Sequence, residues 1–163
     1  RPQTERTLSR ISSQPKRQPS AGEAEVVVRG DPGDPEVPRI LAALQMAAVR
    51  QGRLLLRKAG TEREYLLEPE KIDYFSAREG GVLARAGGED YETRLRLYEL
   101  CRALRPQGFV QISKGIVVNV QAVRAVEAEF SGNYTALLRD GKTRLTISRS
   151  YMRDFRNYVL EGK

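Results

Sequence analysis

Two cationic side chains follow directly on segments that alternate like β-strands, where they could bind an anion. Lys114 comes after Val110 and Ile112, and Arg149 comes shortly after a second segment that ends at Ile147. Arginine can bind a phosphate with two parallel hydrogen bonds or read the O6 and N7 atoms of guanine, whereas lysine acts more as a point charge. From the residues alone, ordinary solvated surface charge is the commoner interpretation, and DNA contact is the alternative.

Two serines flank Arg149 at the predicted start of a helix, and either Ser148 or Ser150 could be its N-cap. The first N–H groups of a helix have no partner within it and lie at the positive end of the helix dipole. A phosphate can therefore bind at this junction through backbone N–H groups as well as through the arginine.

Few side chains could carry enzymatic chemistry. The sequence has no histidine and one cysteine, which excludes zinc sites and histidine-dependent triads. Glu127 and Glu129 could imitate an acid–base pair on one strand face, but no activated nucleophile accompanies them, so solvated charge is the better interpretation. Cys101 is most simply a core residue, with a redox-sensing thiol as the alternative. We predict no enzymatic activity, metal, cofactor or small-molecule substrate.

The charge is basic and unevenly distributed. The net charge is +7, with net +4 in residues 1–22, net +4 in residues 109–163 and net −2 in residues 59–108. Such a surplus favours a polyanionic partner, because Lys and Arg release counterions from phosphates on binding. One cysteine, no membrane-spanning run and no signal peptide predict a cytoplasmic protein.

The first third of the chain is predicted to be a tail and a leader. Residues 1–22 are rich in Ser, Gln, Pro and basic residues and almost lack apolar ones, which predicts a disordered basic tail. Residues 23–52 predict a small β-α leader, with a strand in EAEVVVR and a helix capped by Asp34. The apolar face of this helix comprises Val37, Leu41, Leu44 and Ala48. The leader is too small to fold alone, so it should pack on the following sheet or on another copy of the chain.

Residues 53–163 predict one antiparallel β domain with short helices. Strands are expected at residues 54–56, 64–67, 72–77, 82–86 and 91–95, each bounded by turn residues. An apolar stripe of Leu97, Leu100, Cys101 and Leu104 then predicts a helix that ends before Gly108. The tyrosines at 65, 74, 91 and 98 lie in apolar patterns and are predicted to be core residues.

The last fifty residues predict two strands around a turn, a hairpin and a closing helix. Lys114-Gly115 interrupts the first alternation, Ser131-Gly132-Asn133 predicts a turn, and Asp140-Gly141 predicts a type I′ hairpin. Tyr151, Phe155 and Tyr158 then recur at helical spacing.

Three stretches of this region together resemble the LytTR DNA-binding domain of bacterial response regulators. They are FVQISKGIVVN, FSGNYTALLRDGK and TISRSYMRDF, and their order and spacing match that family's pattern. The resemblance extends back to about Tyr65. It implies a mainly β fold, an antiparallel β-sandwich-like arrangement with short helices, here preceded by the β-α leader.

The resemblance also implies three regions that contact DNA. The positions that carry over are Arg78, Ser113, Lys114, Arg149 and Ser150. Two residues depart from the family pattern: Ser113 stands where histidine is usual, and Gly115 stands where serine or a related small polar residue is common. These departures leave the phosphate contacts and base preference at this turn open. Asn119 matches a characteristic asparagine of the family, for which we expect a turn or side-chain-to-backbone role.

We therefore predict a stand-alone LytTR-type transcriptional regulator, since the residues before Arg53 lack the length and acidic pocket of a receiver domain. The resemblance implies that loops and strand ends enter successive major grooves of duplex DNA, with some DNA bending, and that two copies, as a homodimer, bind promoter repeats.

Two other classes of function stay open. One is a LytTR-like interaction module or antagonist that pairs with a membrane or regulatory partner protein through the leader and binds DNA weakly. The other is an RNA-binding β domain, in which exposed aromatic side chains would stack on unpaired bases.

Overall fold

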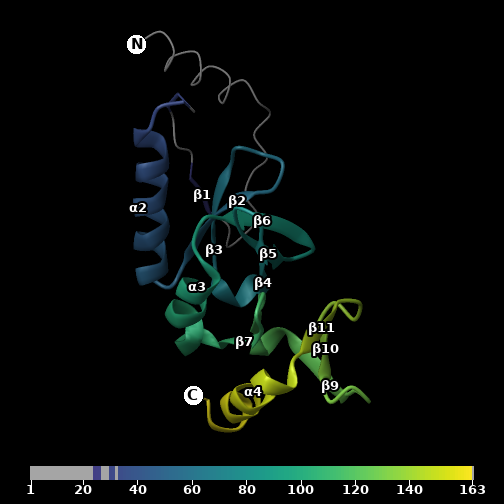
Figure 1. Ribbon diagram of the computed structural model, residues 1–163. Coiled ribbons are helices and arrows are strands. Elements are labelled where there is room, and N and C mark those ends of the chain that lie inside the picture. The colour runs from purple at the N-terminus through teal and green to yellow at the C-terminus, as the bar shows by residue number, and fades with distance from the viewer. Residues whose placement is uncertain (1–23, 27–29, 32, 163) are drawn as a thin grey trace. The chain divides into compact units, whose positions relative to one another are not determined.

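The computed structural model of the chain describes residues 24–26, 30–31 and 33–162 (Figure 1). The predicted disordered tail, residues 1–22, lies outside the described residues. The chain divides into two compact units, one that ends at Glu68 and one that begins at Pro69. No helix among the described residues is long and apolar enough to cross a membrane.

The first unit is a small antiparallel sheet with one helix. Its elements are β1 (Ala24–Val26), α2 (Glu36–Arg50), β2 (Leu54–Lys58) and β3 (Glu64–Leu67), and β3 is hydrogen-bonded between β1 and β2. Leu54, Leu55 and Leu56 are buried on both faces of β2, and α2 packs against this strand. The predicted β-α leader is therefore present as β1 and α2, while the predicted domain boundaries after residues 22 and 52 stay predictions.

Helix α2 begins at Glu36, whose N–H donates to Asp34 Oδ1 at 2.9 Å. Its buried and half-buried side chains are Val37, Leu41, Gln45, Ala48 and Val49. Leu44 was expected on this face, but its side chain is 38% exposed. That part of the prediction is wrong because the buried stripe is centred on Leu41, Gln45 and Ala48, so Leu44 lies to one side of it.

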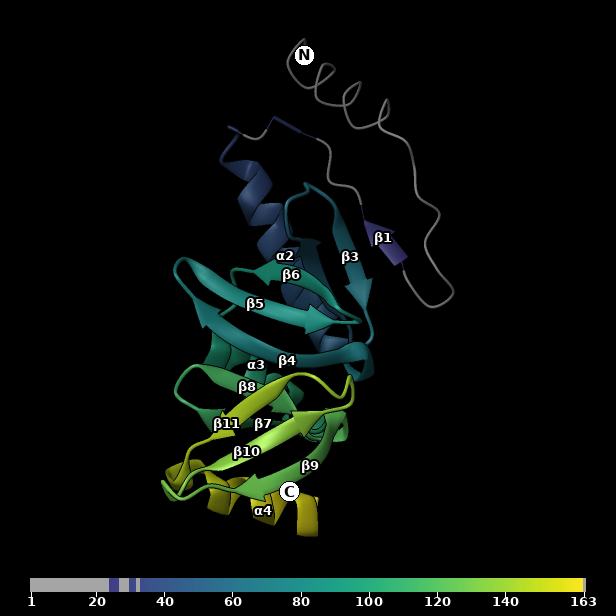
Figure 2. The same ribbon diagram turned by 90° about the vertical axis from the view of Figure 1, so that its right-hand side faces the viewer.

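The second unit contains a larger and a smaller antiparallel sheet. Its strands are β4 (Ile72–Arg78), β5 (Gly81–Ala86), β6 (Glu89–Thr93), β7 (Phe109–Ser113), β8 (Ile116–Asn119), β9 (Val123–Ala128), β10 (Tyr134–Leu138) and β11 (Arg144–Ile147). Its α-helices are α3 (Leu97–Leu104) and α4 (Arg149–Glu161). The larger sheet has the order β6-β5-β4-β8-β7 and the smaller one β11-β10-β9 (Figure 2). The predicted fold class, mainly antiparallel β with short helices, is confirmed.

One apolar core joins the end of the larger sheet to the smaller sheet and α4. It consists of Val110, Ile112, Val118, Ala136, Leu138, Leu145, Ile147 and Phe155. Helix α4 packs on β7. Its position is also held by two polar contacts with the end of α3: Asp154 accepts from the Arg105 guanidinium at 2.8 Å, and the Tyr158 hydroxyl donates to Arg105 O at 2.7 Å.

Polar side chains make long-range contacts where β8 ends: Asn119 joins β8 to β4 within the larger sheet, and Arg139 joins the smaller sheet to β4. The side chain of Asn119 is buried; its Nδ2 donates to Ile72 O at 3.0 Å and its Oδ1 accepts from Gln121 N at 3.0 Å. Close by, Arg139 Nε donates to the largely buried Asp73 at 2.7 Å. The side-chain-to-backbone role predicted for Asn119 is confirmed.

The prediction that Tyr98 is a core residue is wrong. Its side chain is 63% exposed, whereas Tyr65 and Tyr91 are buried and Tyr74 is half-buried. Helix α3 buries Leu100 and Leu104, which lie one turn apart, and Tyr98 lies on another side of so short a helix.

The hairpin around Asp140-Gly141 is present, but the predicted type I′ turn is wrong. That turn needs positive φ at both central residues, and among the described residues only glycines, including Gly141 at 73°, have positive φ. Asp140 Oδ1 instead accepts the N–H groups of Lys142 at 2.9 Å and Thr143 at 2.8 Å. Hydrogen bonds from the Thr143 hydroxyl and from these two N–H groups lower the pKa of Asp140 to about 2.

This lowered pKa predicts an acid-sensitive hairpin. Because the pKa of Asp140 in the folded chain lies below the value of about 3.9 in an unfolded one, the ionised carboxylate stabilises the fold fully above pH ~4 and loses this effect as the pH falls towards about 2. Asp140→Asn keeps an acceptor oxygen but has no charge to lose. The difference in free energy of unfolding between the wild type and this variant should therefore shrink between pH 4 and pH 2 in urea titrations. A constant difference would contradict the prediction.

Replacing Asn119 by alanine should destabilise the fold. Ile72 O and Gln121 N would lose their partner in a buried place, which costs about 1–3 kcal/mol. Gln121→Ala is the matched control, because this side chain is exposed at the same turn and its loss should cost less than about 0.5 kcal/mol. Urea unfolding of both variants measures the difference, and equal stability would show that the Asn119 bonds contribute nothing.

Candidate nucleic-acid interface

The β4–β5 turn and the β7–β8 turn lie at the same edge of the second unit. Strand β8 is antiparallel to both β4 and β7, so the end of β4 and the end of β7 point the same way. Between them, Ala77 N–H donates to Gly115 O at 2.8 Å. This bond holds the residue before Arg78 against the turn that carries Lys114.

The smaller sheet brings two further segments to this edge. Ser148 N–H donates to Ile112 O at 2.9 Å, which joins the β11–α4 junction to the end of β7. Because β9, β10 and β11 are antiparallel, the β9–β10 turn lies at this end as well. Figure 2 shows all four segments along the left side of the unit. We call the set formed by residues 77–81, 113–116, 129–133 and 148–151 the loop edge.

All five residues that the family resemblance implies as DNA contacts lie on the loop edge. The side chains of Arg78, Lys114, Arg149 and Ser150 are exposed, and that of Ser113 is half-buried. In the part of the chain that the structure describes, none of the three cations forms an ion pair; Arg78 donates only to Ala77 O, at 3.4 Å. Their contact with DNA stays a prediction.

Arg149 is held by the β9–β10 turn. Its N–H donates to Asn133 Oδ1 at 3.2 Å, and a Cβ on Gly132 would lie 3.5 Å from one of its guanidinium nitrogens. Gly132, at a φ of 90°, gives the turn the backbone shape that places Asn133 here. Ser148 occupies the N-cap position of α4 as predicted, but its hydroxyl makes no capping bond.

Asn133 was missed as a site residue. The motif Ser131-Gly132-Asn133 indicates a turn, and this is confirmed. The bond from Arg149 to Asn133, however, spans 16 residues, and the local pattern carries no signal of it.

The turn at Lys114-Gly115 is also confirmed, but its glycine is not required by backbone shape. Gly115 does not have a positive φ, and a Cβ there would meet Ala77 Cβ at 4.0 Å, an ordinary contact. A serine, the type of residue common in the family pattern, would therefore fit at this position.

The charges around the loop edge are mixed, with the basic ones continuing along α4. Arg153 and Arg156 follow Arg149 at steps of four and three residues, so they share one side of the helix, and both are exposed. Glu79 is exposed in the β4–β5 turn. The carboxylate of Glu129 instead accepts hydrogen bonds from the hydroxyls of Ser131 and Thr135.

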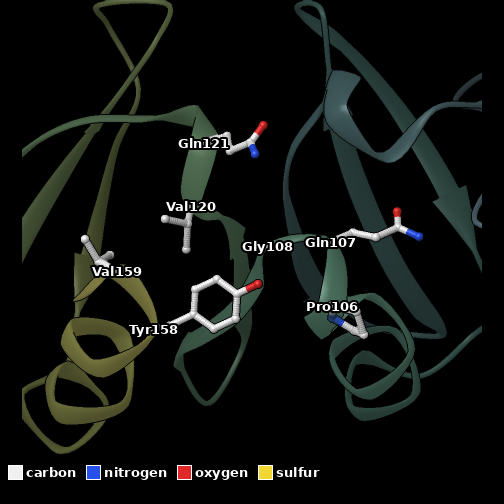
Figure 3. A pocket seen from close by; sticks show the side chains of 7 residues that line it. All are labelled: Pro106, Gln107, Gly108, Val120, Gln121, Tyr158 and Val159. Atoms are coloured by element: carbon white, nitrogen blue, oxygen red, sulfur yellow. The ribbon is translucent and has the colours of Figure 1, made fainter. Parts of the chain in front are cut away.

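A pocket of about 310 Å³ lies at the other end of the β7–β8 hairpin (Figure 3). Its lining residues are Pro106, Gln107, Gly108, Val120, Gln121, Tyr158 and Val159. None of these side chains is charged, so the pocket offers no cation to a phosphate. Nor do the described residues contain a group of acidic or cysteine side chains arranged to hold a metal ion.

Comparison with known proteins gives one consistent family. The model of the LytTR DNA-binding domain matches residues 62–159. The transcriptional regulatory protein YpdB of Escherichia coli K12 is 27% identical over 98 residues, which are 60% of this chain and 40% of YpdB. The sensory transduction protein LytT of Bacillus subtilis is 20% identical over 94 residues, 58% of this chain and 39% of LytT. The chain thus spans about two-fifths of the length of these relatives.

A solved LytTR DNA-binding domain from Bacillus cereus has the same fold. Its TM-score is 0.57, and the match covers 64% of this chain and 96% of that domain at 19% sequence identity. At this identity the likeness establishes the fold and leaves the contacting residues to be tested.

The Asn133 bond should matter for stability, whereas the Ser148 hydroxyl should not. Asn133→Ala leaves the first N–H of α4 without its acceptor, and loss of such a cap costs about 1 kcal/mol. Ser148→Ala removes no hydrogen bond and should change the free energy of unfolding by less than about 0.5 kcal/mol. Urea unfolding of the two variants checks this order, and the reverse order would contradict the contact.

Proposed function

The chain belongs to the LytTR DNA-binding domain family, and we propose that it is a transcriptional regulator that reads duplex DNA with its loop edge. The relatives that share this domain are named as a transcriptional regulatory protein and a sensory transduction protein. Duplex DNA is the partner that the family and the basic surface both favour.

One observation carries the proposal: two backbone hydrogen bonds bring three cations from distant segments to one edge. Arg78, Lys114 and Arg149 come from the β4–β5 turn, the β7–β8 turn and the β11–α4 junction, and the bonds from Ala77 to Gly115 and from Ser148 to Ile112 align them. Cations carried on separate turns along one edge can reach into successive grooves of a duplex, which a single recognition helix cannot do.

The three cations would have different roles. Arg149 is seated on Gly132 and Asn133, so its guanidinium is partly oriented before binding and suits base reading in the major groove. Lys114, at the tip of a turn, suits a phosphate or a base acceptor as a point charge, and Arg78 suits a backbone phosphate. Ser113 and Ser150 would add hydroxyl donors beside them.

The start of α4 offers a further phosphate donor. Among its first three N–H groups, that of Arg149 donates to Asn133 Oδ1 and that of Tyr151 donates to Ser148 O. Within the described residues, the N–H of Ser150 has no protein acceptor. A phosphate at the positive end of the helix would supply one.

We further propose that two copies bind a repeated promoter site in the cytoplasm. Two loop edges on neighbouring repeats would double the number of phosphate contacts, and bending of the DNA would let more of each edge reach the duplex. Titration of the protein into a duplex with one repeat and a duplex with two repeats would give the number of protein copies bound to each, and we expect one and two copies.

An interaction module remains the second candidate, because the first unit exposes apolar side chains. Ile40, Leu44 and Met46 on α2 are 48%, 38% and 41% exposed. A regulatory or membrane partner protein, or a second copy of the chain, could cover them. This candidate requires a tight stoichiometric complex and weak DNA binding.

Fluorescence anisotropy with duplex DNA from the gene's own upstream region tests the proposal, with scrambled duplex and single-stranded RNA as controls. A sequence-reading regulator should prefer the upstream duplex at physiological salt. Equal, weak binding to all three that disappears as salt rises would mean that only the basic surface acts, and preference for the RNA would favour an RNA-binding domain.

Arg149→Ala should weaken specific binding by about 1–3 kcal/mol and relax base preference at one position of the site. Lys114→Ala and Arg78→Ala, where they contact phosphates, should weaken binding to all duplexes alike and lower the salt slope by about 1 each. Arg124→Ala is the matched control, because Arg124 is an exposed arginine beside Gly141, at the opposite end of the smaller sheet. Equal losses for Arg149→Ala and Arg124→Ala would contradict the site.

A further inference from the structure

Phe130 is an aromatic side chain that the fold does not use. It lies in the β9–β10 turn and is fully exposed, whereas Phe75, Phe109 and Phe155 are buried. Single exposed apolar residues are common and need no explanation by themselves. Phe130 needs an explanation because hydrogen bonds hold the backbone of its turn and because the Arg149 side chain lies against the same turn.

The turn holds Phe130 in a defined place. Glu129 N–H donates to Asn133 O at 2.9 Å, and Gly132 N–H donates back to Glu129 O at 3.1 Å. The Ser131 hydroxyl donates to the Glu129 carboxylate at 3.2 Å and accepts from Asn133 N at 3.3 Å. The ring is therefore presented on a closed loop, so the backbone of this turn loses little conformational freedom on binding and the ordering that remains is that of the ring itself.

The same turn also contacts Arg149. The Arg149 side chain lies against Gly132, two residues after Phe130, and its N–H is bound by Asn133. The cation and the aromatic ring thus share one platform on the loop edge, and an object that meets Arg149 is also within reach of the turn.

The chemistry of this pair fits the major groove. An arginine reads guanine O6 and N7, while the only apolar feature at the base edges there is the thymine C5 methyl group. The neighbouring Glu129 carboxylate disfavours close approach of this turn to a phosphate or to an anionic membrane surface. Base edges are then the part of the duplex that the turn can meet.

We propose that Phe130 is a specificity-determining residue that packs on a thymine methyl group in the major groove next to the base contacted by Arg149. This inference rests on the proposed function, since it requires that the loop edge binds duplex DNA. It adds a second base-reading side chain, and it adds selection for thymine, which the cations alone do not provide.

The test uses the full chain and a preferred duplex selected from a random library, in which each thymine is replaced in turn by deoxyuridine. This replacement removes one methyl group and leaves every hydrogen-bonding atom in place. For the wild type, it should weaken binding about fourfold at one or two positions, the loss expected for one buried methyl group. For Phe130→Ala, those positions should become insensitive, and affinity for the unmodified duplex should fall by at least a similar factor. Phe130→Leu should restore part of the sensitivity.

The outcomes separate this proposal from the function on which it rests. A wild type that prefers no duplex would refute both. A selective wild type whose Phe130→Ala variant binds equally well would refute the role of Phe130 alone. Weaker binding by Phe130→Ala with unchanged deoxyuridine penalties would also refute it, because the ring would then act as a wedge between base pairs or as a packing surface rather than as a methyl reader.

Discussion

The hairpin of β7 and β8 is the constraint on which the rest of the second unit depends. One flank is bonded to β4 through Gly115 O, and the other to the β11–α4 junction through Ile112 O. On β7 itself, Val110 and Ile112 are buried in the core shared with the smaller sheet and α4. A slip of one residue would turn these side chains to the opposite face, so their burial fixes the register. The register in turn decides which residues stand on the loop edge.

The opposite end of the same hairpin is held by polar contacts as well as by the buried ring of Phe109, which packs on Phe75. Asn119 joins β8 to β4 there, and the ion pair of Arg139 with Asp73 joins the smaller sheet to β4. The ion pair of Arg105 with Asp154 holds α4 to the end of α3. Because both ends of the β7–β8 hairpin are held in place, the turns of the loop edge keep fixed positions. A binding surface made of turns then loses little conformational entropy when a ligand meets it.

The order and type of most elements could be predicted from the sequence, because period-two alternation and turn residues are local signals. The errors arose where the same local sequence pattern is compatible with two different structures. The apolar stripe of α2 turned slightly away from Leu44, and Asp140 used its carboxylate in place of the type I′ backbone shape. The site was harder to predict. No local signal joins Asn133 to Arg149 or marks Phe130 as exposed. Only the family resemblance placed Arg78 at the same site as Arg149, which is 71 positions away in the sequence.

Backbone amide shifts in a two-dimensional NMR titration with the preferred duplex would test most directly whether the loop edge is the DNA-binding surface. Amides in residues 77–81, 113–116, 129–133 and 148–151 should shift together and with the same saturation. Those of Gly108, Gln121 and Gly141, at the far ends of the same hairpins, should stay in place. Shifts gathered at the far ends or along α2, with the loop edge unchanged, would contradict the account.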